Sequence, residues 1–225
     1  MTDPEDDHLT EIVLLVDRSG SMENIRDDAI GGINAFLSDQ RREPGRATIT
    51  LVLFDDEYLV VERAADIGDV APLTRQTFVP RGTTALLDAW GRAMAETSER
   101  VNKLPEDEQP DDVVFVVVTD GYENASKEYS RDVVFRRVDR LTDDEGWRFV
   151  YLGANQDAVA EGTKLGVRQD SAMTFSGDHH GTVVSLIAVS AGVSRLRRGT
   201  AGDEFFTESE REEQERLLKK KKKLH

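Results

Sequence analysis

Short apolar runs alternate with amphipathic stretches along most of the chain. The runs are rich in β-branched residues and have the length of buried strands. They occupy residues 11–16, 48–54, 113–119, 147–152 and, more weakly, 172–175. Apolar residues at helical spacing fill the intervals, over residues 22–40, 86–101, 133–141 and 183–193. This alternation predicts an α/β domain with a mostly parallel central sheet and helices on both of its faces.

A hairpin is expected after the second strand. Asp55 and Asp56 separate the run 48–54 from a further apolar run at 58–61, and a short polar break between two strands favours an antiparallel pair. Residues 64–80, which hold a glycine and two prolines, are typical of a long irregular loop. The sheet should therefore have one antiparallel edge strand.

Residues that favour helix N-termini precede three of the expected helices. Ser130 is the expected cap of the helix that follows it, and Asn155 is the expected cap of a short helix over 155–162. Thr207 and Glu210 have the spacing of a capping box, which predicts a short charged helix near the C-terminus.

The pattern divides the chain into three parts. Residues 1–10 are expected to be an acidic flexible leader, residues 11–198 a single domain, and residues 199–225 a polar tail that is either disordered or helical. The tail includes the run Lys219 to Lys223, for which a solvated, disordered end is the favoured interpretation. Contact of this run with an acidic partner or a nucleic acid is the alternative.

Charge restricts the partners of the domain. The chain carries 29 Lys and Arg against 44 Asp and Glu, a formal net charge of −15. Six of the bases lie in residues 216–225, which hold no acid, so residues 1–215 carry 23 bases against 44 acids. A body this acidic repels a phosphate backbone, which argues against nucleic-acid binding by the domain.

The composition also suggests a compartment. Cysteine is absent, which excludes disulfides, thiolate zinc sites and a cysteine nucleophile. No run approaches the ~20 apolar residues that span a bilayer, and the first residues lack the basic and apolar regions of a secretory signal. We therefore expect a cytoplasmic protein without a membrane contact.

Oxygen-bearing side chains stand at strand ends and helix starts in three places. Asp17, Ser19 and Ser21 alternate in D-R-S-G-S after the first strand, so their side chains can converge in an extended loop. Asp120 follows a strand in T-D-G, and Thr84 precedes a helix in R-G-T-T-A. Ligand sites of such sheets lie beyond the carboxyl ends of the strands. Sets made only of oxygen suit hard cations, Mg²⁺ first, with Mn²⁺ or Ca²⁺ as alternatives.

The combination of these motifs resembles the metal-ion-dependent adhesion site (MIDAS) of the von Willebrand factor type A (vWA) domain family. Asp17-x-Ser19-x-Ser21, Thr84 and Asp120 stand at the places that the family's motif occupies, between alternating strands and helices. The resemblance covers most of the chain. The stretches F-D-D-E-Y, R-G-T-T-A-L-L-D-A, T-D-G-Y-E-N-A-S and F-V-Y-L-G-A-N-Q-D-A are similar to the small, stand-alone bacterial and phage members.

The resemblance implies a Rossmann-like three-layer fold and a site that binds rather than catalyses. Ser19, Ser21 and Thr84 would coordinate the cation through hydroxyl oxygens. Asp17 and Asp120 would act largely through bound waters, or one of them directly. The implied function is a divalent-cation-dependent protein-binding module that captures an Asp or Glu side chain of a partner. It would be a monomer without enzymatic activity that works within a multiprotein assembly.

Three residues near the implied site remain open. Thr83 is the alternative to Thr84 as the ligand. Glu123 and Asn124 follow Asp120 closely and could tune the site or contact a ligand.

Two other function classes compete with the binding module. A Mg²⁺-dependent phosphoryl-transfer enzyme also places an Asp after its first strand, but Ser19 stands where haloacid-dehalogenase-like phosphatases need a second Asp as general acid. The phosphate-binding and nucleophile-elbow motifs G-x-x-x-x-G-K-[ST], G-x-G-x-x-G and G-x-S-x-G are missing. The other alternative is a metal-free structural scaffold, which predicts that substitution of Asp17 or Ser19 changes neither partner binding nor metal-dependent stability.

Overall fold

A six-stranded sheet forms the middle layer of the protein, whose computed structural model describes residues 8–202 and 204–222. The strands are β1 (Leu9–Asp17), β2 (Arg46–Phe54), β3 (Tyr58–Asp66), β4 (Asp112–Thr119), β5 (Arg148–Ala154) and β6 (Ala172–Phe175). Their order across the sheet is β3-β2-β1-β4-β5-β6. All neighbours pair in parallel except β2 and β3, which are antiparallel. The predicted parallel sheet with one antiparallel edge strand is confirmed.

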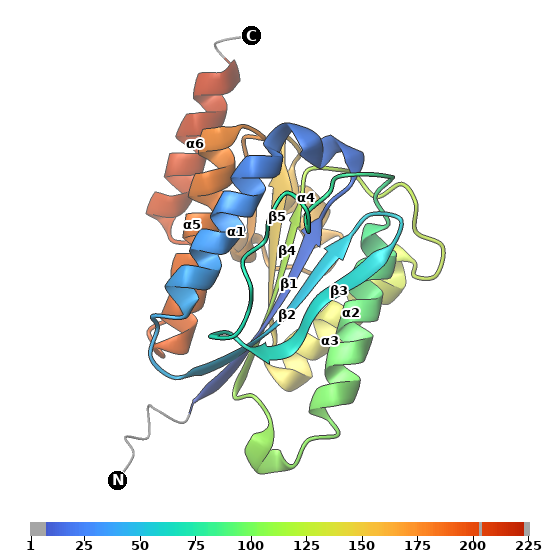
Figure 1. Ribbon diagram of the computed structural model, residues 1–225, viewed down its shortest axis with the longest axis vertical. Helices are drawn as coiled ribbons and strands as arrows, with labels where there is room; N and C mark the ends of the chain where they lie inside the picture. The colour runs from blue at the N-terminus through green and yellow to red at the C-terminus, as the bar shows by residue number, and fades with distance from the viewer. Residues whose placement is uncertain (1–7, 203, 223–225) are drawn as a thin grey trace.

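Helices cover both faces of this sheet and complete a three-layer α/β fold (Figure 1). On one face lie α1 (Arg26–Gln40) and α5 (His179–Arg197), and on the other lie α2 (Leu86–Val101), α3 (Arg131–Glu145) and the short α4 (Ala158–Thr163). The last helix, α6 (Glu208–Lys222), packs against α5 and the edge strand β6. The described residues also form the short 3₁₀ helices η2 (Gly20–Ile25), η3 (Glu106–Glu108) and η4 (Gln169–Ser171). Among the described residues, no helix combines the length and hydropathy that crossing a bilayer requires.

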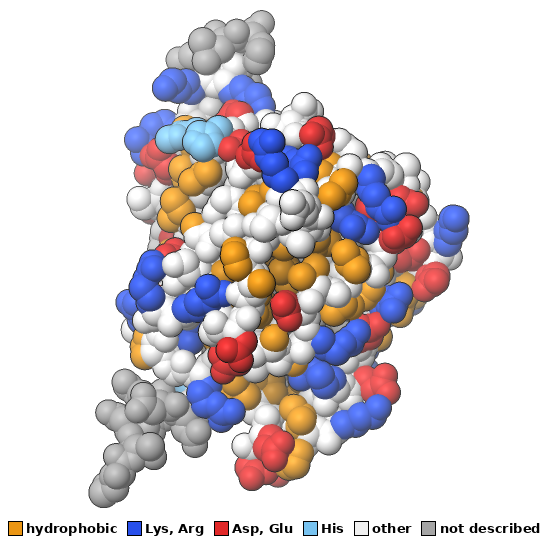
Figure 2. Space-filling model, viewed as in Figure 1, with side chains coloured by type: hydrophobic (Ala, Val, Ile, Leu, Met, Phe, Trp, Pro, Cys, Tyr) orange, Lys and Arg blue, Asp and Glu red, His pale blue; other side chains and the backbone are white. Residues whose placement is uncertain are grey.

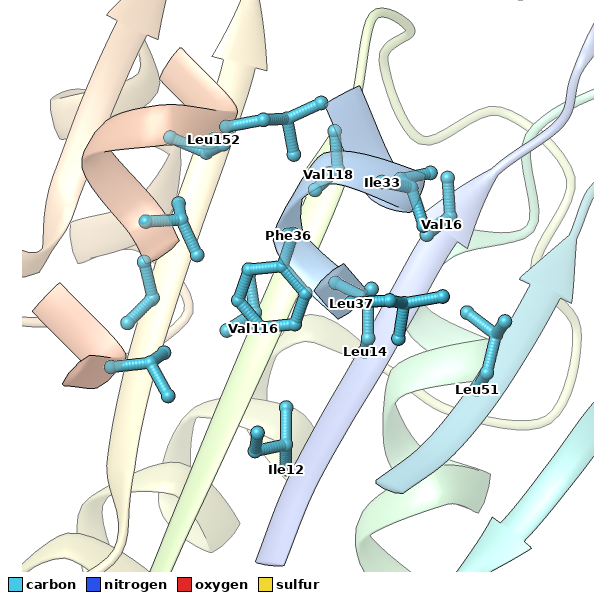
Figure 3. Close-up of a cluster of buried hydrophobic side chains, with 14 of the residues drawn as sticks. Ile12, Leu14, Val16, Ile33, Phe36, Leu37, Leu51, Val116, Val118 and Leu152 are labelled. Atoms are coloured by element: carbon cyan, nitrogen blue, oxygen red, sulfur yellow. The ribbon is translucent and has the colours of Figure 1, made fainter. Parts of the chain in front are cut away.

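Two apolar cores lie on opposite sides of the sheet, because successive side chains of a strand point to opposite faces. Leu14 and Val16 of β1 belong to the core under α1 and α5, which Phe36 fills (Figure 3). Val13, between them and on the other face, belongs to the core under α2, where Trp90 is fully buried. Strands that are buried on both faces explain the nearly continuous apolar runs in the sequence.

Several elements extend beyond their predicted bounds, including β1, which begins at Leu9 within the expected leader. Two of the differences have a clear physical cause. The helix expected over 22–40 begins as the 3₁₀ helix η2, in which Met22 N–H donates to Ser19 O (3.0 Å), and becomes an α-helix only at Arg26. The strand expected over 58–61 continues to Asp66. This edge strand is only partly buried, so its side chains do not follow the apolar pattern that marks the inner strands.

The cap predicted at Asn155 is wrong. Asp157 caps α4 instead, because its side chain accepts the Ala160 N–H at 3.0 Å. Asn155 lies in the left-handed region, with φ of 54°. Its Oδ1 accepts the Gly177 N–H (3.0 Å) and its N–H donates to Phe175 O (3.0 Å), so it joins the carboxyl ends of β5 and β6. The cap predicted at Ser130 of α3 is confirmed.

The segment after α5 is anchored to the domain. Phe205 and Phe206 are buried in the core under α1 and α5. The predicted capping box is confirmed, since Glu210 N–H donates to Thr207 Oγ1 (3.3 Å) and Thr207 N–H donates to Glu210 Oε2 (2.7 Å).

The helix α6 corrects the interpretation of the lysine run. Lys219 to Lys221 lie in its last turns, so the disordered end favoured from charge alone does not apply to them. The burial of the two phenylalanines brings this polar segment onto the domain, which a charge run by itself does not indicate. Lys223 and most of the expected leader lie outside the described residues.

Candidate metal centre

The three oxygen-bearing motifs meet at one edge of the sheet. Asp17 ends β1, and Ser19 and Ser21 follow it, Ser21 within η2. The loop after β4 carries Asp120, and the segment before α2 carries Thr84. Because β1 and β4 are parallel neighbours, the loops after them leave the same edge side by side.

Hydrogen bonds link four of the five predicted residues. Ser21 Oγ donates to Asp120 Oδ1 at 2.6 Å, and the hydroxyl oxygens of Ser19 and Ser21 are 3.1 Å apart. Asp17 Oδ1 accepts the Ser19 N–H at 2.6 Å. Asp17 Oδ2 accepts the hydroxyl of Thr119, also at 2.6 Å. The carboxylates and hydroxyls therefore form one continuous polar network.

Thr84 reaches the same place from the third segment, as the surroundings of Gly121 show. A methyl group on Gly121 would lie 2.9 Å from Thr84 Oγ1, 3.5 Å from Asp17 Oδ2 and 3.6 Å from Ser21 Oγ. Oxygens from three distant parts of the sequence thus surround one small space that only a glycine leaves open. Thr84 is buried, whereas the alternative ligand Thr83 is exposed.

Burial disfavours the charged form of both carboxyl groups. Burial raises the pKa of Asp17 from 3.8 to about 6, although the hydrogen bonds from Thr119 and Ser19 act in the opposite direction. Burial also raises the pKa of Asp120, against the hydrogen bond from Ser21. A cation beside these groups would stabilise their ionised forms.

The donor set fits a small hard cation. The predicted residues offer two carboxylates and three hydroxyls, all of them oxygen ligands of the kind that Mg²⁺ and Mn²⁺ accept. Within the described part of the chain, no group of three or more His, Asp or Glu side chains is arranged to hold a metal. The hydroxyls therefore have to complete the ligand set at this edge.

Asn124 positions Thr84. The Thr84 N–H donates to Asn124 Oδ1 at 3.0 Å, and the Asn124 N–H donates back to Thr84 O at 3.1 Å. This reciprocal pair fixes the segment before α2 against the loop after β4. Asn124 therefore contacts the backbone of a predicted ligand, and its role toward a bound ligand stays a prediction.

Glu123 and Ser126 cap α2 from outside the helix. Glu123 Oε2 accepts the Leu87 N–H (2.9 Å) and Ser126 Oγ accepts the Asp88 N–H (3.0 Å). In return, the Asp88 carboxylate accepts the backbone N–H groups of residues 127–129 at 2.7–2.8 Å. The N-cap position of α2 itself makes no side-chain cap. The segments R-G-T-T-A-L-L-D-A and T-D-G-Y-E-N-A-S are therefore joined by hydrogen bonds in the structure.

Asp55 is a positioning residue that the sequence analysis did not include in the site. It is fully buried, with Oδ2 at 3.0 Å from Arg18 Nε and 2.9 Å from Arg81 Nε, and its carbonyl accepts the Ala85 N–H (2.8 Å). It thereby ties the loop after β1 to the segment before α2. It also forms the expected hairpin turn, in which Asp55 N–H donates to Glu57 O (3.0 Å). Its place directly after β2, at the same edge of the sheet, was the available signal.

Comparison with known proteins identifies the fold. No protein-family model and no curated protein matches the sequence. Solved structures do match, among them proximal thread matrix protein 1 from the mussel byssus "with zinc occupied MIDAS motif", at 18% identity and a TM-score of 0.56 over 85% of this chain and 46% of that one. A von Willebrand factor type A protein from Catenulispora acidiphila matches at 16% identity and a TM-score of 0.53, over 84% of this chain and 43% of that one.

A manganese-loaded TRAP protein from Plasmodium vivax also matches, at 18% identity and a TM-score of 0.52, over 81% of this chain and 72% of that one. The chain spans less than half of the length of the mussel and Catenulispora proteins. Identities this low show a shared fold. The protein has the fold of vWA domains.

Proposed function

We propose that the protein is a divalent-cation-dependent protein-binding module, with the cation held by Asp17, Ser19, Ser21, Thr84 and Asp120. The observation that carries this proposal is the convergence of these oxygens, from three separate segments, around one small space. Mg²⁺ or Mn²⁺ is the proposed cation, with Ca²⁺ as the alternative. Metal-loaded structures with the same fold, one with zinc and one with manganese, support a cation at this site.

The hydroxyl and carboxylate groups of the site would have different roles. The hydroxyls of Ser19, Ser21 and Thr84 would bind the cation without neutralising it, and the two carboxylates are held by protein hydrogen bonds at its side. A bound cation would supply an open coordination position with uncompensated positive charge, which attracts a carboxylate from outside. The proposed ligand is therefore an Asp or Glu side chain of a partner protein.

The same proposal extends to the cellular setting. We propose that the protein works in the cytoplasm, as a monomer that contributes to a multiprotein assembly. The absence of cysteine supports the compartment, because disulfides are typical of oxidising settings. Catalysis is not part of the proposal, because Ser19 stands where a phosphatase of this type would need a general acid.

Titration calorimetry on the metal-stripped protein tests the proposal. Mg²⁺ and Mn²⁺ should each bind at a single site in the wild type, and Asp17→Ala should abolish this binding. Ser21→Ala is a second variant, because Ser21 is exposed and its loss should not disturb folding. Asp69→Ala is the control, because Asp69 is exposed and distant in the fold from this edge.

Two results would overturn the proposal. Binding that persists unchanged in Asp17→Ala and Ser21→Ala would place the cation elsewhere. If neither cation binds the wild type, the metal-free scaffold becomes the better description.

A further inference from the structure

A deep groove lies between α4, β6 and α6. Its volume is about 810 Å³, which is within the range of ~300–1,000 Å³ of typical ligand sites. Apolar side chains from all three elements line it, namely Val159 of α4, Ala172 and Met173 of β6, and Leu218 of α6. We call this feature the α6 groove.

The wall formed by α6 is fixed to the domain. Arg195 of α5 makes a bidentate ion pair with Glu210, with both N–O distances at 2.9 Å. Phe205 and Phe206, just before the helix, are buried in the core under α1 and α5. The groove is therefore preformed, which lowers the entropic cost of binding.

The groove lies next to the proposed metal site. Tyr122 lies two residues after Asp120, is 60% exposed, and lines the groove. Gln156, which also lines the groove, donates from Nε2 to the Gly121 carbonyl at 3.4 Å. A chain that places one side chain at the metal site can therefore continue into the groove.

Two buried glutamines connect the wall of the groove to the domain. Gln156 and Gln214 are 5% and 1% exposed, and each donates from Nε2 to a backbone carbonyl, of Gly121 and Gly181 respectively. Their Oε1 atoms are buried and have no hydrogen-bond partner within the described part of the chain. Both residues line the groove. Because these oxygens are not accessible from the groove, the two glutamines join its wall to the rest of the domain and leave the contacts with an occupant to the exposed lining residues.

Charge favours acidic side chains only at one end of the groove. Along its length the charges are balanced, because Asp157 and Glu215 line it together with Arg211 and Lys221. Lys221 Nζ lies 3.1 Å from Asn155 Oδ1, so α6 ends at the same end of the molecule as the carboxyl ends of the strands (Figure 1). Lys221, with Lys220 before it in the last turn of α6, thus places positive charge at this end of the groove in a chain whose net charge is −15. A partner with several carboxylates would be attracted to this edge.

We propose that the α6 groove binds a segment of the partner protein in which apolar residues lie next to the Asp or Glu that occupies the metal site. The inference rests on the proposed function and names the kind of partner. The carboxylate would occupy the metal site, the neighbouring apolar side chains would contact Val159 and Leu218, and further acidic side chains would lie near Lys221.

A peptide library tests this proposal on the full chain. The probe is a set of fluorescein-labelled decapeptides with one fixed Asp and each other position randomised in turn, measured by anisotropy with saturating Mn²⁺ and with EDTA. Peptides with apolar residues within a few positions of the Asp should bind best, and only with Mn²⁺. Val159→Glu and Leu218→Glu should weaken the selected peptides at least tenfold and leave the affinity for Mn²⁺ unchanged. Val133→Glu on α3 is the matched control, because Val133 is exposed and outside the groove.

The outcomes separate this inference from the proposed function. Mn²⁺-dependent binding without apolar preference, or binding that survives both groove variants, would overturn the inference and leave the metal-dependent module in place. Absence of any peptide binding to Mn²⁺-loaded protein would also overturn it. If Mn²⁺ itself does not bind, the proposed function fails, and the inference fails with it.

Discussion

Asp17 is fully buried at the carboxyl ends of the strands, an unfavourable environment for its charged form. Its carboxyl group receives hydrogen bonds from Ser19 and Thr119, which lower its pKa, while the nearby Asp120 raises it. Burial dominates, so the ionised form is destabilised in the metal-free protein. This arrangement favours cation binding over the stability of the metal-free fold.

The pH dependence of stability should therefore differ between the wild type and Asp17→Asn. Between pH 3.8 and about 6, the folded metal-free protein retains a proton on Asp17 that the unfolded chain releases, so the free energy of unfolding falls as pH rises through this window. Asp17→Asn removes this contribution, which is at most about 3 kcal/mol at ~1.4 kcal/mol per pKa unit. Urea denaturation in EDTA from pH 4 to 7 measures the difference between the two proteins. A difference that does not change over this range would contradict the burial argument.

The space beside Gly121 gives a second test at the residue scale. Gly121→Ala would place a methyl group 2.9 Å from Thr84 Oγ1 and within 3.6 Å of the oxygens of Asp17 and Ser21. We expect at least a tenfold loss of Mn²⁺ affinity in calorimetry, with little change in thermal stability. Gly31→Ala is the control, because an added methyl group there meets no atom within 4 Å and Gly31 lies in a helix. Mn²⁺ affinity that is equal in both variants would place the cation away from this space.

At the scale of elements, the site depends on an exchange of caps between α2 and the loop after β4. Glu123 and Ser126 accept N–H groups from the first turn of α2, and Asp88 of α2 accepts three N–H groups from the loop. Asn124, in the same loop, accepts a hydrogen bond from the Thr84 N–H and donates one to the Thr84 carbonyl. The capping contacts therefore stabilise the helix and position a proposed ligand together.

Removal of one cap should reduce stability and metal affinity together. Glu123→Ala leaves the N–H groups of Leu87, Ala125 and Ser126 without their acceptor. Loss of a helix cap typically costs about 0.5–2 kcal/mol, so we expect a loss in the upper part of this range and weaker Mn²⁺ binding. Urea denaturation and calorimetry measure the two effects. Glu128→Ala, at an exposed position of the same loop, should change neither quantity; if it does, the effect does not come from the cap.

At the scale of the whole molecule, α6 extends the domain beyond the five helices that cover the sheet. On the face shown in Figure 2, acidic and basic side chains are interspersed, whereas the last turns of α6 carry consecutive lysines. Phe205 and Phe206 attach this basic helix to the core under α1 and α5. The anchor thus sets where the positive charge of the C-terminal segment lies.

Phe206→Ala tests whether the anchor contributes to the stability of the whole domain. Phe206 is fully buried, and truncation of a buried Phe typically costs about 3–5 kcal/mol. We expect a loss of this size in urea denaturation, in a single cooperative transition. Phe135→Ala on α3 should cost far less, because Phe135 is 39% exposed. A loss for Phe206→Ala as small as that of the control would mean that α6 unfolds independently of the domain.

The type of each strand and helix, and their order along the chain, were predictable from the sequence. Hydrophobic periodicity is a local property, and the inner strands are buried on both faces, so their apolar runs mark them clearly. The edge strand β3 and the start of α1 were less predictable, because partial burial and a 3₁₀ turn weaken that periodicity. The motifs after β1 and β4 and before α2 were also visible, since they interrupt the pattern at strand and helix ends.

What the sequence by itself determined is the alternation of elements and the chemistry of the residues at their ends. Only the tertiary structure decided how these ends meet. Asn and Asp have similar capping preferences, so the choice of Asp157 over Asn155 depends on the contact of Asn155 with Gly177. The burial of Thr84 rather than Thr83, the role of Asp55 and the position of α6 all depend on contacts between residues far apart in the chain. Such contacts leave no periodic signal in the sequence, because they are established only when the sheet brings the separate segments together.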